Sequence, residues 1–246
     1  MHIFYSPDNI TTLNEEESRH AVQVLRLKTG DEIWITDGKG GFYKAQITNP
    51  YHKACEVKVI EESKGYGKRN FNLHIAIAPT KNIDRLEWFL EKATEIGIDE
   101  ITPLLSRHSE RDVIKSERLQ KVLVSAIKQS VKAYLPKLNE LTKFNDLVKA
   151  PFNGQKFIAH CATMPSPTSP PTHLPRRGEQ TPLLQKIYTA GKNALILVGP
   201  EGDFSPEEVT LATQNGFTEI SLGDSRLRTE TAGLQACSII NILNEI

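Results

Sequence analysis

Short, largely apolar runs alternate with amphipathic stretches from residue 73 onward, and this alternation constrains the fold more than any other feature. The predicted strands are LHIAIA (73–78), EITPLL (100–105), KFIAHC (156–161) and ALILV (194–198). Helices are predicted at 84–97 and 116–131, between the first three strands. Strands joined through helices pair in parallel and form a sheet covered on both faces. We therefore predict an α/β domain over residues 71–246.

Residues 1–68 show a different pattern and are predicted to form a small β-rich domain. EIWIT (32–36) alternates as a strand does, DGKGG (37–41) is a turn, and FYKAQIT (42–48) returns as a hairpin partner before the strand CEVKVI (55–60). Asn14 followed by Glu17 indicates a capping box at the start of a helix that Gly30 ends. The polar stretch 62–70 is predicted to be a linker.

A stretch rich in Pro, Ser and Thr, MPSPTSPPTHLPRRGEQTP (164–182), interrupts the second pattern. It has too few apolar residues to offset the entropy lost on ordering, so we predict a mobile surface insertion. Because ALILV resumes the sheet after it, this stretch is not predicted to be a domain boundary.

Composition limits the possible partners. Basic and acidic residues both number 30, so a nucleic acid would have to bind local patches, such as 105–137 with eight basic and three acidic residues. A solvated helix face is the alternative interpretation of that patch. The three cysteines are isolated, no apolar run is long enough for a membrane helix, and the N-terminus does not read as a signal peptide. We expect a cytoplasmic protein with no metal site and no membrane partner.

A glycine-bearing loop, LVGPEGDFSPEE (197–208), follows the most apolar strand. Gly199 and Gly202 allow positive φ angles and close approach of the backbone to a ligand. Ser205 with Glu208 forms a predicted capping box, and the helix is expected to run to Gly216. The loop has neither the Gly-Lys-Ser/Thr of a phosphate loop nor the dinucleotide fingerprint. An ordinary strand-to-helix turn remains the alternative.

The stretch SLGDSRLRTETAGLQA (221–236) places charges between a predicted strand and the final helix. Thr229 or Thr231 is expected to cap that helix, which is apolar on most faces and so should be buried in the core or against another subunit. Glu230 suits a helix N-terminus, but Arg226 and Arg228 do not, because cations are unfavourable there. Ligands bind at the carboxyl ends of parallel strands, so these arginines indicate a functional site.

Four stretches together resemble one known family. They are GPEG, the LRTETA region, RHAVQVLRLKTGD (19–31) and KATEIGIDEITPLLSRHSER (92–111), and they are similar to bacterial 16S ribosomal RNA (uracil-N3)-methyltransferases. These enzymes belong to the SPOUT superfamily of methyltransferases that use S-adenosyl-L-methionine (AdoMet). The resemblance covers nearly the whole chain.

The resemblance implies a fold, a reaction and partners. The implied fold is a trefoil-knotted α/β methyltransferase domain over 71–246 with a PUA-like RNA-binding barrel over 1–68. The implied reaction is AdoMet-dependent methylation of N3 of a uridine in 16S rRNA, on the assembled 30S subunit, by a homodimer. Three alternatives stay open: an RNA-binding module without catalysis, a methyltransferase for a different RNA position, and a small-molecule enzyme such as a nucleotide hydrolase.

The same resemblance implies roles for individual residues. The implied catalytic residues are Arg228, which stabilises charge on the uracil, and Glu230, the candidate base. Cofactor contacts are implied for Leu197, Gly199, Pro200, Glu201, Gly202, Leu222, Gly223, Leu227, Thr229, Thr231 and Ala232. RNA contacts are expected at Arg19, His20, Arg26, Lys28, Arg107, Arg111 and Arg226. Two positions depart from the family: Asp203 stands where glycine is usual, and 128–136 has Lys128 in an acidic position and no arginine.

Overall fold

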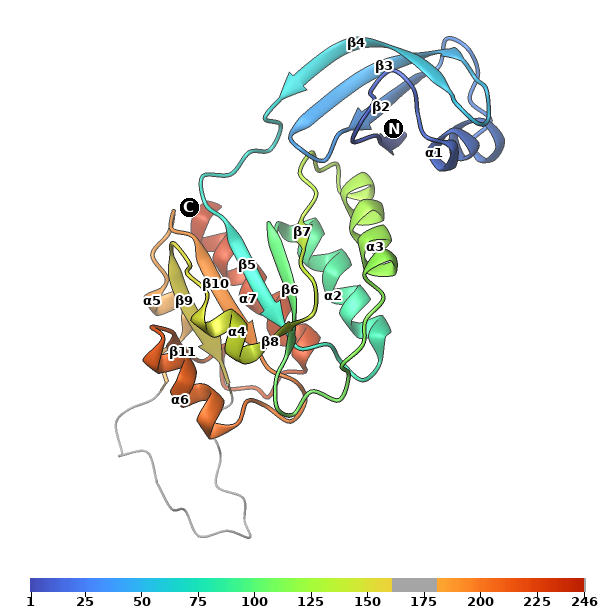
Figure 1. The fold of residues 1–246 in the computed structure, drawn as a ribbon. Helices are drawn as coiled ribbons and strands as arrows, with labels where there is room; N and C mark the ends of the chain where they lie inside the picture. The colour runs from blue at the N-terminus through green and yellow to red at the C-terminus, as the bar shows by residue number, and fades with distance from the viewer. Residues whose placement is uncertain (161–180, 246) are drawn as a thin grey trace. The chain divides into compact units, whose positions relative to one another are not determined.

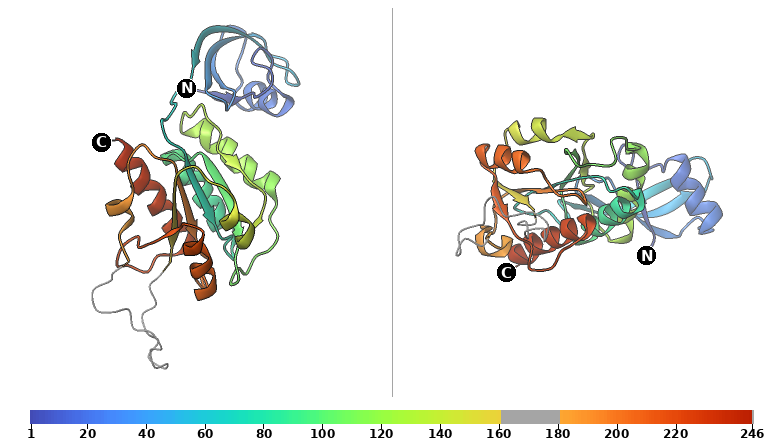
Figure 2. Two further views of the ribbon diagram at one scale, coloured as in Figure 1. Left: turned by 60° about the vertical axis from the view of Figure 1, so that its left-hand side comes forward. Right: turned by 90° about the horizontal axis from the view of Figure 1, so that it is seen from below.

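The computed structural model describes residues 1–160 and 181–245, and their contacts divide them into two compact units (Figures 1 and 2). Unit 1 comprises Met1–Arg69 with Gln120–Pro136, and unit 2 comprises Asn70–Leu119 with Lys137–Ile246. The grouping of Gln120–Pro136 with unit 1 has no counterpart in the division expected from the sequence. The Pro-rich insertion predicted at 164–182 lies outside the described residues except for its last two.

Unit 1 is built on a four-stranded sheet. The strands are β1 (Ile3–Tyr5), β2 (Glu32–Thr36), β3 (Gly41–Asn49) and β4 (Glu56–Lys64), in that spatial order. β1 pairs with β2 in parallel and the other pairs are antiparallel, which confirms the predicted hairpin. β4 continues to Lys64, so the linker was predicted to begin too early. Alternate residues such as Ile33, Ile35 and Ala45 form the buried core of this unit.

The helix of unit 1 is shorter than predicted. α1 (Glu15–Arg19) begins as expected, with the Asn14 side chain accepting from Glu17 N at 2.9 Å. The second bond of the predicted capping box, from the Asn14 N–H to the Glu17 carboxylate, does not form. The Glu17 carboxylate accepts from Lys128 Nζ at 2.6 Å instead. The chain then forms the π-helix η1 (His20–Val24), and Arg26 takes a φ of 58°, which ends the helical path before Gly30.

Unit 2 contains the predicted parallel sheet. Its strands are β5 (Leu73–Ile77), β6 (Glu100–Leu105), β7 (Lys137–Leu138), β8 (Thr142–Lys143), β9 (Gln155–Ala159), β10 (Ala194–Val198) and β11 (Thr218–Ile220). The order is β11-β9-β10-β5-β6-β7, with β8 also pairing with β6, and every pair is parallel. β10, the most apolar run of the sequence, lies between β9 and β5 and is buried along its whole length (Figure 1).

Helices cover both faces of this sheet, as parallel strands require. They are α2 (Ile83–Ile96), α4 (Phe144–Lys149), α5 (Leu184–Ile187), α6 (Pro206–Gln214) and α7 (Thr229–Glu245). A further helix, α3 (Ser116–Gln129), begins in unit 2 and continues into the segment Gln120–Pro136 of unit 1. α4 and α6 pack over one face around Phe144, Phe204 and Phe217. α2 and α7 pack together over the other face, where Gly233 of α7 lies against Phe89 of α2.

The final helix is buried along one face only. Gly233, Ala236, Cys237 and Ile240 are buried, whereas Ile242 is 56% exposed. The sequence predicted an apolar helix that is buried in the core or against another subunit. Within unit 2, the face of α7 that packs on α2 is buried.

Candidate active site

Two loops of unit 2 begin at the same edge of the sheet. β10 ends at Val198 and β11 ends at Ile220, and both residues pair with Ala159 at the end of β9. The loop that starts at Gly199 and the loop that starts at Ser221 therefore leave the carboxyl edge at one level, on either side of β9. This is the edge at which open α/β sheets bind ligands.

The first loop forms a tight turn whose strain lies at a residue other than the two glycines. Asp203 N donates to Pro200 O at 3.0 Å, and Asp203 has a φ of 62°. Neither Gly199 nor Gly202 uses the positive φ that glycine allows. An aspartate tolerates the left-handed region better than most residues because it can bond locally, and Asp203 Oδ1 accepts from Phe204 N at 2.8 Å. Glycine takes this conformation without strain, which explains physically why the resembled family usually has glycine there.

Gly199 and Gly202 instead allow close packing. A Cβ on Gly199 would lie 3.2 Å from the Phe204 ring, and one on Gly202 would lie 3.2 Å from the His108 Cβ. Gly199 and Pro200 are buried, whereas Glu201 and Gly202 are exposed. The loop thus presents Glu201 and Gly202 to solvent at the sheet edge.

The helix that follows holds this loop in place. Ser205 and Glu208 form the predicted capping box, with Pro206 as the first residue of α6. Glu208 Oε1, the carboxylate oxygen that takes no part in the capping box, accepts from Arg107 N at 2.8 Å. This bond ties the segment after β6 to the loop. His108 adds a second tie, because its Nδ1 lies 3.0 Å from Asp203 O.

The second loop folds back onto α7. Gly223 has a φ of 127° and donates its N–H to Ser221 Oγ at 3.1 Å. The Gln235 side chain of α7 donates to Leu222 O. Leu222 and Leu227 are partly buried, and 223–226 are exposed. The loop therefore combines partly buried apolar side chains with exposed residues, at the same edge of the sheet as the first loop.

Arg228 and Glu230 stand at the start of α7, as predicted. Ala232 N donates to Arg228 O at 2.8 Å, so Arg228 is the capping residue and the prediction of a threonine cap is wrong. Arg226 and Arg228 are exposed and have no ion-pair partner among the described residues. The positive charges are thus free to meet a ligand.

Glu230 has the opposite environment. It is 8% exposed, its Oε2 is buried with no hydrogen-bond partner among the described residues, and its Oε1 lies 4.0 Å from Arg85 Nε. A buried carboxylate oxygen without a donor is costly, and such an atom in a site is explained most simply by a donor that arrives with a ligand. Sequence reasoning missed Arg85, whose only signal was its place in the first turn of the helix at 84–97.

The predicted RNA-binding residues of unit 2 differ in their availability. Arg107 is exposed and reaches Glu207 at 3.1 Å, an exposed pair of little strength. Arg111 instead donates to the backbone oxygens of Thr80 at 3.2 Å and Lys81 at 2.7 Å, so it fastens the loop after β5.

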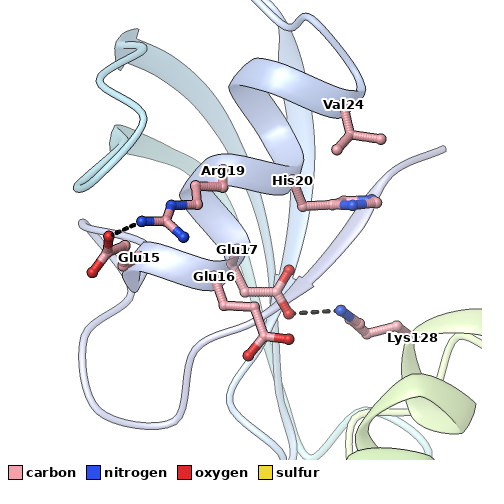
Figure 3. A pocket seen from close by; sticks show the side chains of 7 residues that line it. All are labelled: Glu15, Glu16, Glu17, Arg19, His20, Val24 and Lys128. Carbon is pink, nitrogen blue, oxygen red and sulfur yellow. Dashed lines mark hydrogen bonds and ion pairs between the residues drawn. The ribbon is translucent and has the colours of Figure 1, made fainter.

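Two of the four candidates in unit 1 share a pocket. Arg19 and His20 line a surface pocket of about 600 Å³ together with Glu15, Glu16, Glu17, Val24 and Lys128 (Figure 3). Arg19 pairs with Glu15 at 2.5 Å, and the His20 ring lies edge-on to Phe4. Arg26 and Lys28 are exposed and lie outside the pocket lining. Lys128 occupies the position where the resembled family is acidic, and here it pairs with Glu17.

Among the described residues, no group of three or more His, Cys, Asp or Glu side chains is arranged to hold a metal ion. None of the helices in this described part of the chain combines the length and apolar character that crossing a membrane requires.

Comparisons with known proteins agree with this architecture. The family described as "RNA methyltransferase domain" matches residues 67–241, and the one described as "RNA methyltransferase PUA domain" matches residues 13–60. The ribosomal RNA small subunit methyltransferase E of Rickettsia conorii is 27% identical, over 95% of this chain and 90% of the relative.

Solved structures also match this chain over nearly its whole length. The crystal structure of a probable rRNA-methyltransferase from Porphyromonas gingivalis is 39% identical, with a TM-score of 0.86 and coverage of 100% of this chain and 99% of the other. The ribosomal RNA small subunit methyltransferase E of Neisseria gonorrhoeae, bound to S-adenosyl methionine, is 25% identical, with a TM-score of 0.83 and coverage of 99% and 98%. The family resemblance read from the sequence is thereby confirmed, and the chain belongs to the RNA methyltransferase family that carries an N-terminal PUA domain.

Proposed function

We propose that the chain transfers a methyl group from AdoMet to N3 of a uridine in 16S rRNA. The observation that carries this proposal is that two glycine-bearing loops leave the sheet at one edge. The second loop is followed by the exposed Arg228 and by Glu230, whose buried Oε2 has no hydrogen-bond partner among the described residues. The names of the relatives, which are ribosomal RNA small subunit methyltransferases, support the choice of RNA.

The two loops fit AdoMet. Leu222 and Leu227 offer partly buried apolar surface for the adenine, and the exposed backbone around Gly202 and Gly223 offers polar groups for the rest of the molecule. The further cofactor contacts that we propose are Leu197, Gly199, Pro200, Glu201, Thr229, Thr231 and Ala232. AdoMet, when bound, supplies an electrophilic methyl group, so positioning and electrostatics are left to the protein.

Glu230 and Arg228 take complementary roles in the proposed reaction. Glu230 Oε2 accepts the proton from uracil N3, which gives this buried oxygen the donor that it lacks. Arg228 donates to a uracil oxygen as negative charge spreads over the ring. Arg85 Nε lies 4.0 Å from the other oxygen of Glu230 and helps to hold the carboxylate in place.

The finer features of the fold and assembly belong to the same proposal. We propose that the backbone of 71–246 is knotted as a trefoil, that 1–68 closes as a PUA-like barrel, and that the chain acts in the cytoplasm on assembled 30S subunits. We also propose a homodimer, supported by exposed apolar side chains on the paired helices, namely Trp88 of α2 at 42% and Ile242 of α7 at 56%. Sedimentation that shows an active monomer at micromolar concentration would contradict the dimer.

AdoMet titration by calorimetry tests the proposal against its alternatives. An RNA-binding module without catalysis, or a nucleotide hydrolase, would show no affinity for AdoMet. A methyltransferase for another RNA position would bind AdoMet but would yield a different methylated nucleoside when 16S rRNA is digested and analysed by mass spectrometry.

A further inference from the structure

Three aromatic rings form a stacked column on unit 1. Trp34 lies on β2, Phe42 on β3, and Tyr66 in the turn that follows β4. The ring centroids of Trp34 and Phe42 are 5.2 Å apart at an interplanar angle of 22°, and those of Phe42 and Tyr66 are 4.6 Å apart at 15°. We call these three residues the aromatic column.

The aromatic column lies on the face of the sheet opposite the core. Successive side chains of a strand point to opposite faces, and Ile33 and Ile35 on either side of Trp34 are core residues. On β3 the residues of that core cluster are Ala45 and Ile47, with Tyr43 packed against them, so Phe42 points to the opposite face with Trp34. Phe42 is only 4% exposed, and the rings of Trp34 and Tyr66 stack on it.

The outer end of the aromatic column is open and held in place. Tyr66 is 42% exposed, and its N–H donates to Gly40 O at 3.0 Å. Gly65 and Gly67 on either side have φ angles of 68° and 70°, a conformation that favours glycine, so Tyr66 forms the tip of a tight turn. A ring that is already fixed loses little conformational freedom when a ligand stacks on it.

Basic residues flank Tyr66 in the sequence. Residues 63–70 contain Lys64, Lys68 and Arg69 and no acidic residue. Lys64 is 81% exposed and has an ion pair with Glu62 at 3.4 Å, a contact too exposed to hold it away from a phosphate. Lys68 is exposed and has no side-chain partner among the described residues.

We propose that the aromatic column is a stacking platform for an unpaired base of the RNA substrate, with Lys64 and Lys68 contacting the adjacent phosphates. An aromatic face flanked by lysines is the arrangement that binds single-stranded nucleic acid with little dependence on base identity. This inference rests on the proposed function, because it assigns an RNA contact to a surface distinct from Arg19, His20, Arg26 and Lys28.

The test measures the anisotropy of a labelled single-stranded RNA of about 12 nucleotides, a length within the range that one small RNA-binding fold covers. Tyr66→Leu removes the ring and is expected to weaken binding about 5- to 150-fold, which corresponds to about 1–3 kcal/mol of base stacking. Tyr66→Trp keeps a stacking surface and is expected to bind within a few-fold of wild type. Tyr51→Leu is the matched control, because Tyr51 is 48% exposed in unit 1 but is not part of the aromatic column.

Two outcomes would overturn the platform. One is a natively folded Tyr66→Leu protein that binds the RNA as tightly as wild type. The other outcome applies if Tyr66→Leu does not fold, and it uses the tryptophan fluorescence of Tyr66→Trp. If saturating RNA quenches the fluorescence of Tyr66→Trp no more than that of the wild-type protein, stacking on residue 66 is excluded. The proposed function fails separately, through RNA that binds normally but is never methylated.

Discussion

Replacing Arg228 by alanine separates a catalytic role from a structural one. The Arg228 side chain is exposed and has no ion-pair partner among the described residues, and its carbonyl begins α7. Its removal should therefore break no contact. Loss of a cation from a helix N-terminus should stabilise the fold by about 0.3–1 kcal/mol, which raises the melting temperature of a chain of this size by about 1–4 °C.

The same substitution should lower the rate of methyl transfer. If Arg228 meets the charge that develops on the uracil, the rate should fall by about 10²- to 10³-fold, or roughly 2.7–4 kcal/mol. AdoMet affinity should stay within a few-fold of wild type. The assay is single-turnover methyl transfer to saturating 30S subunits, with AdoMet titration and thermal melting of the same preparations.

Arg226→Ala is the matched control, since Arg226 is also exposed and unpaired in the described part of this loop. It should weaken RNA binding and flatten its salt dependence, as loss of a phosphate contact does, while leaving the rate at saturating RNA intact. A wild-type rate for Arg228→Ala, or complete loss of AdoMet binding, would refute the transition-state role.

Three further predictions follow from the geometry of unit 2. Gly202→Val should abolish AdoMet binding in calorimetry while circular dichroism shows a native fold, and an unchanged affinity would remove this loop from the cofactor site. Gly233→Val should lower the free energy of unfolding in urea by about 1–3 kcal/mol, because a Cβ there would lie 2.8 Å from the Phe89 ring; an unchanged stability would contradict the tight packing of α2 on α7. Burial lowers the pKa of His74, so the unfolded chain binds a proton before the folded chain does as the pH falls below about 6.5. The free energy of unfolding of the wild-type protein should therefore decline more steeply with falling pH than that of His74→Gln. Equal slopes of the free energy of unfolding against pH in the two proteins would contradict this.

The sheet of unit 2 was predictable because its strands are buried on both faces. Such strands read as continuous apolar runs, and β5, β6, β9 and β10 all lie where those runs occur. The capping box from Ser205 to Glu208 was also predictable, since it depends only on residues three apart.

The features that were missed depend on contacts distant in sequence. Glu17 was assigned to its own helix, but its partner Lys128 lies 111 positions away. The 4.0 Å approach of Arg85 to Glu230 joins two helices and leaves no local signal. The aromatic column is likewise assembled from two strands and a turn, each of which looks ordinary alone.

The left-handed conformation at Asp203 was missed for a different reason. Two glycines stood beside it, and glycine is the residue that this conformation ordinarily favours. The hydrogen bond from Asp203 N to Pro200 O closes the turn, and the left-handed residue of that turn is Asp203. The two glycines instead allow close packing.

The most direct test of the central claim is nucleoside analysis of unmethylated 30S subunits after incubation with the protein and methyl-labelled AdoMet. The account predicts one product, uridine methylated at N3, with label confined to 16S rRNA, and much slower formation of that product by Glu230→Gln and Arg228→Ala. Label on another base or another atom of uridine would contradict the proposed chemistry, and no transfer at all under saturating AdoMet would contradict the assignment of this site.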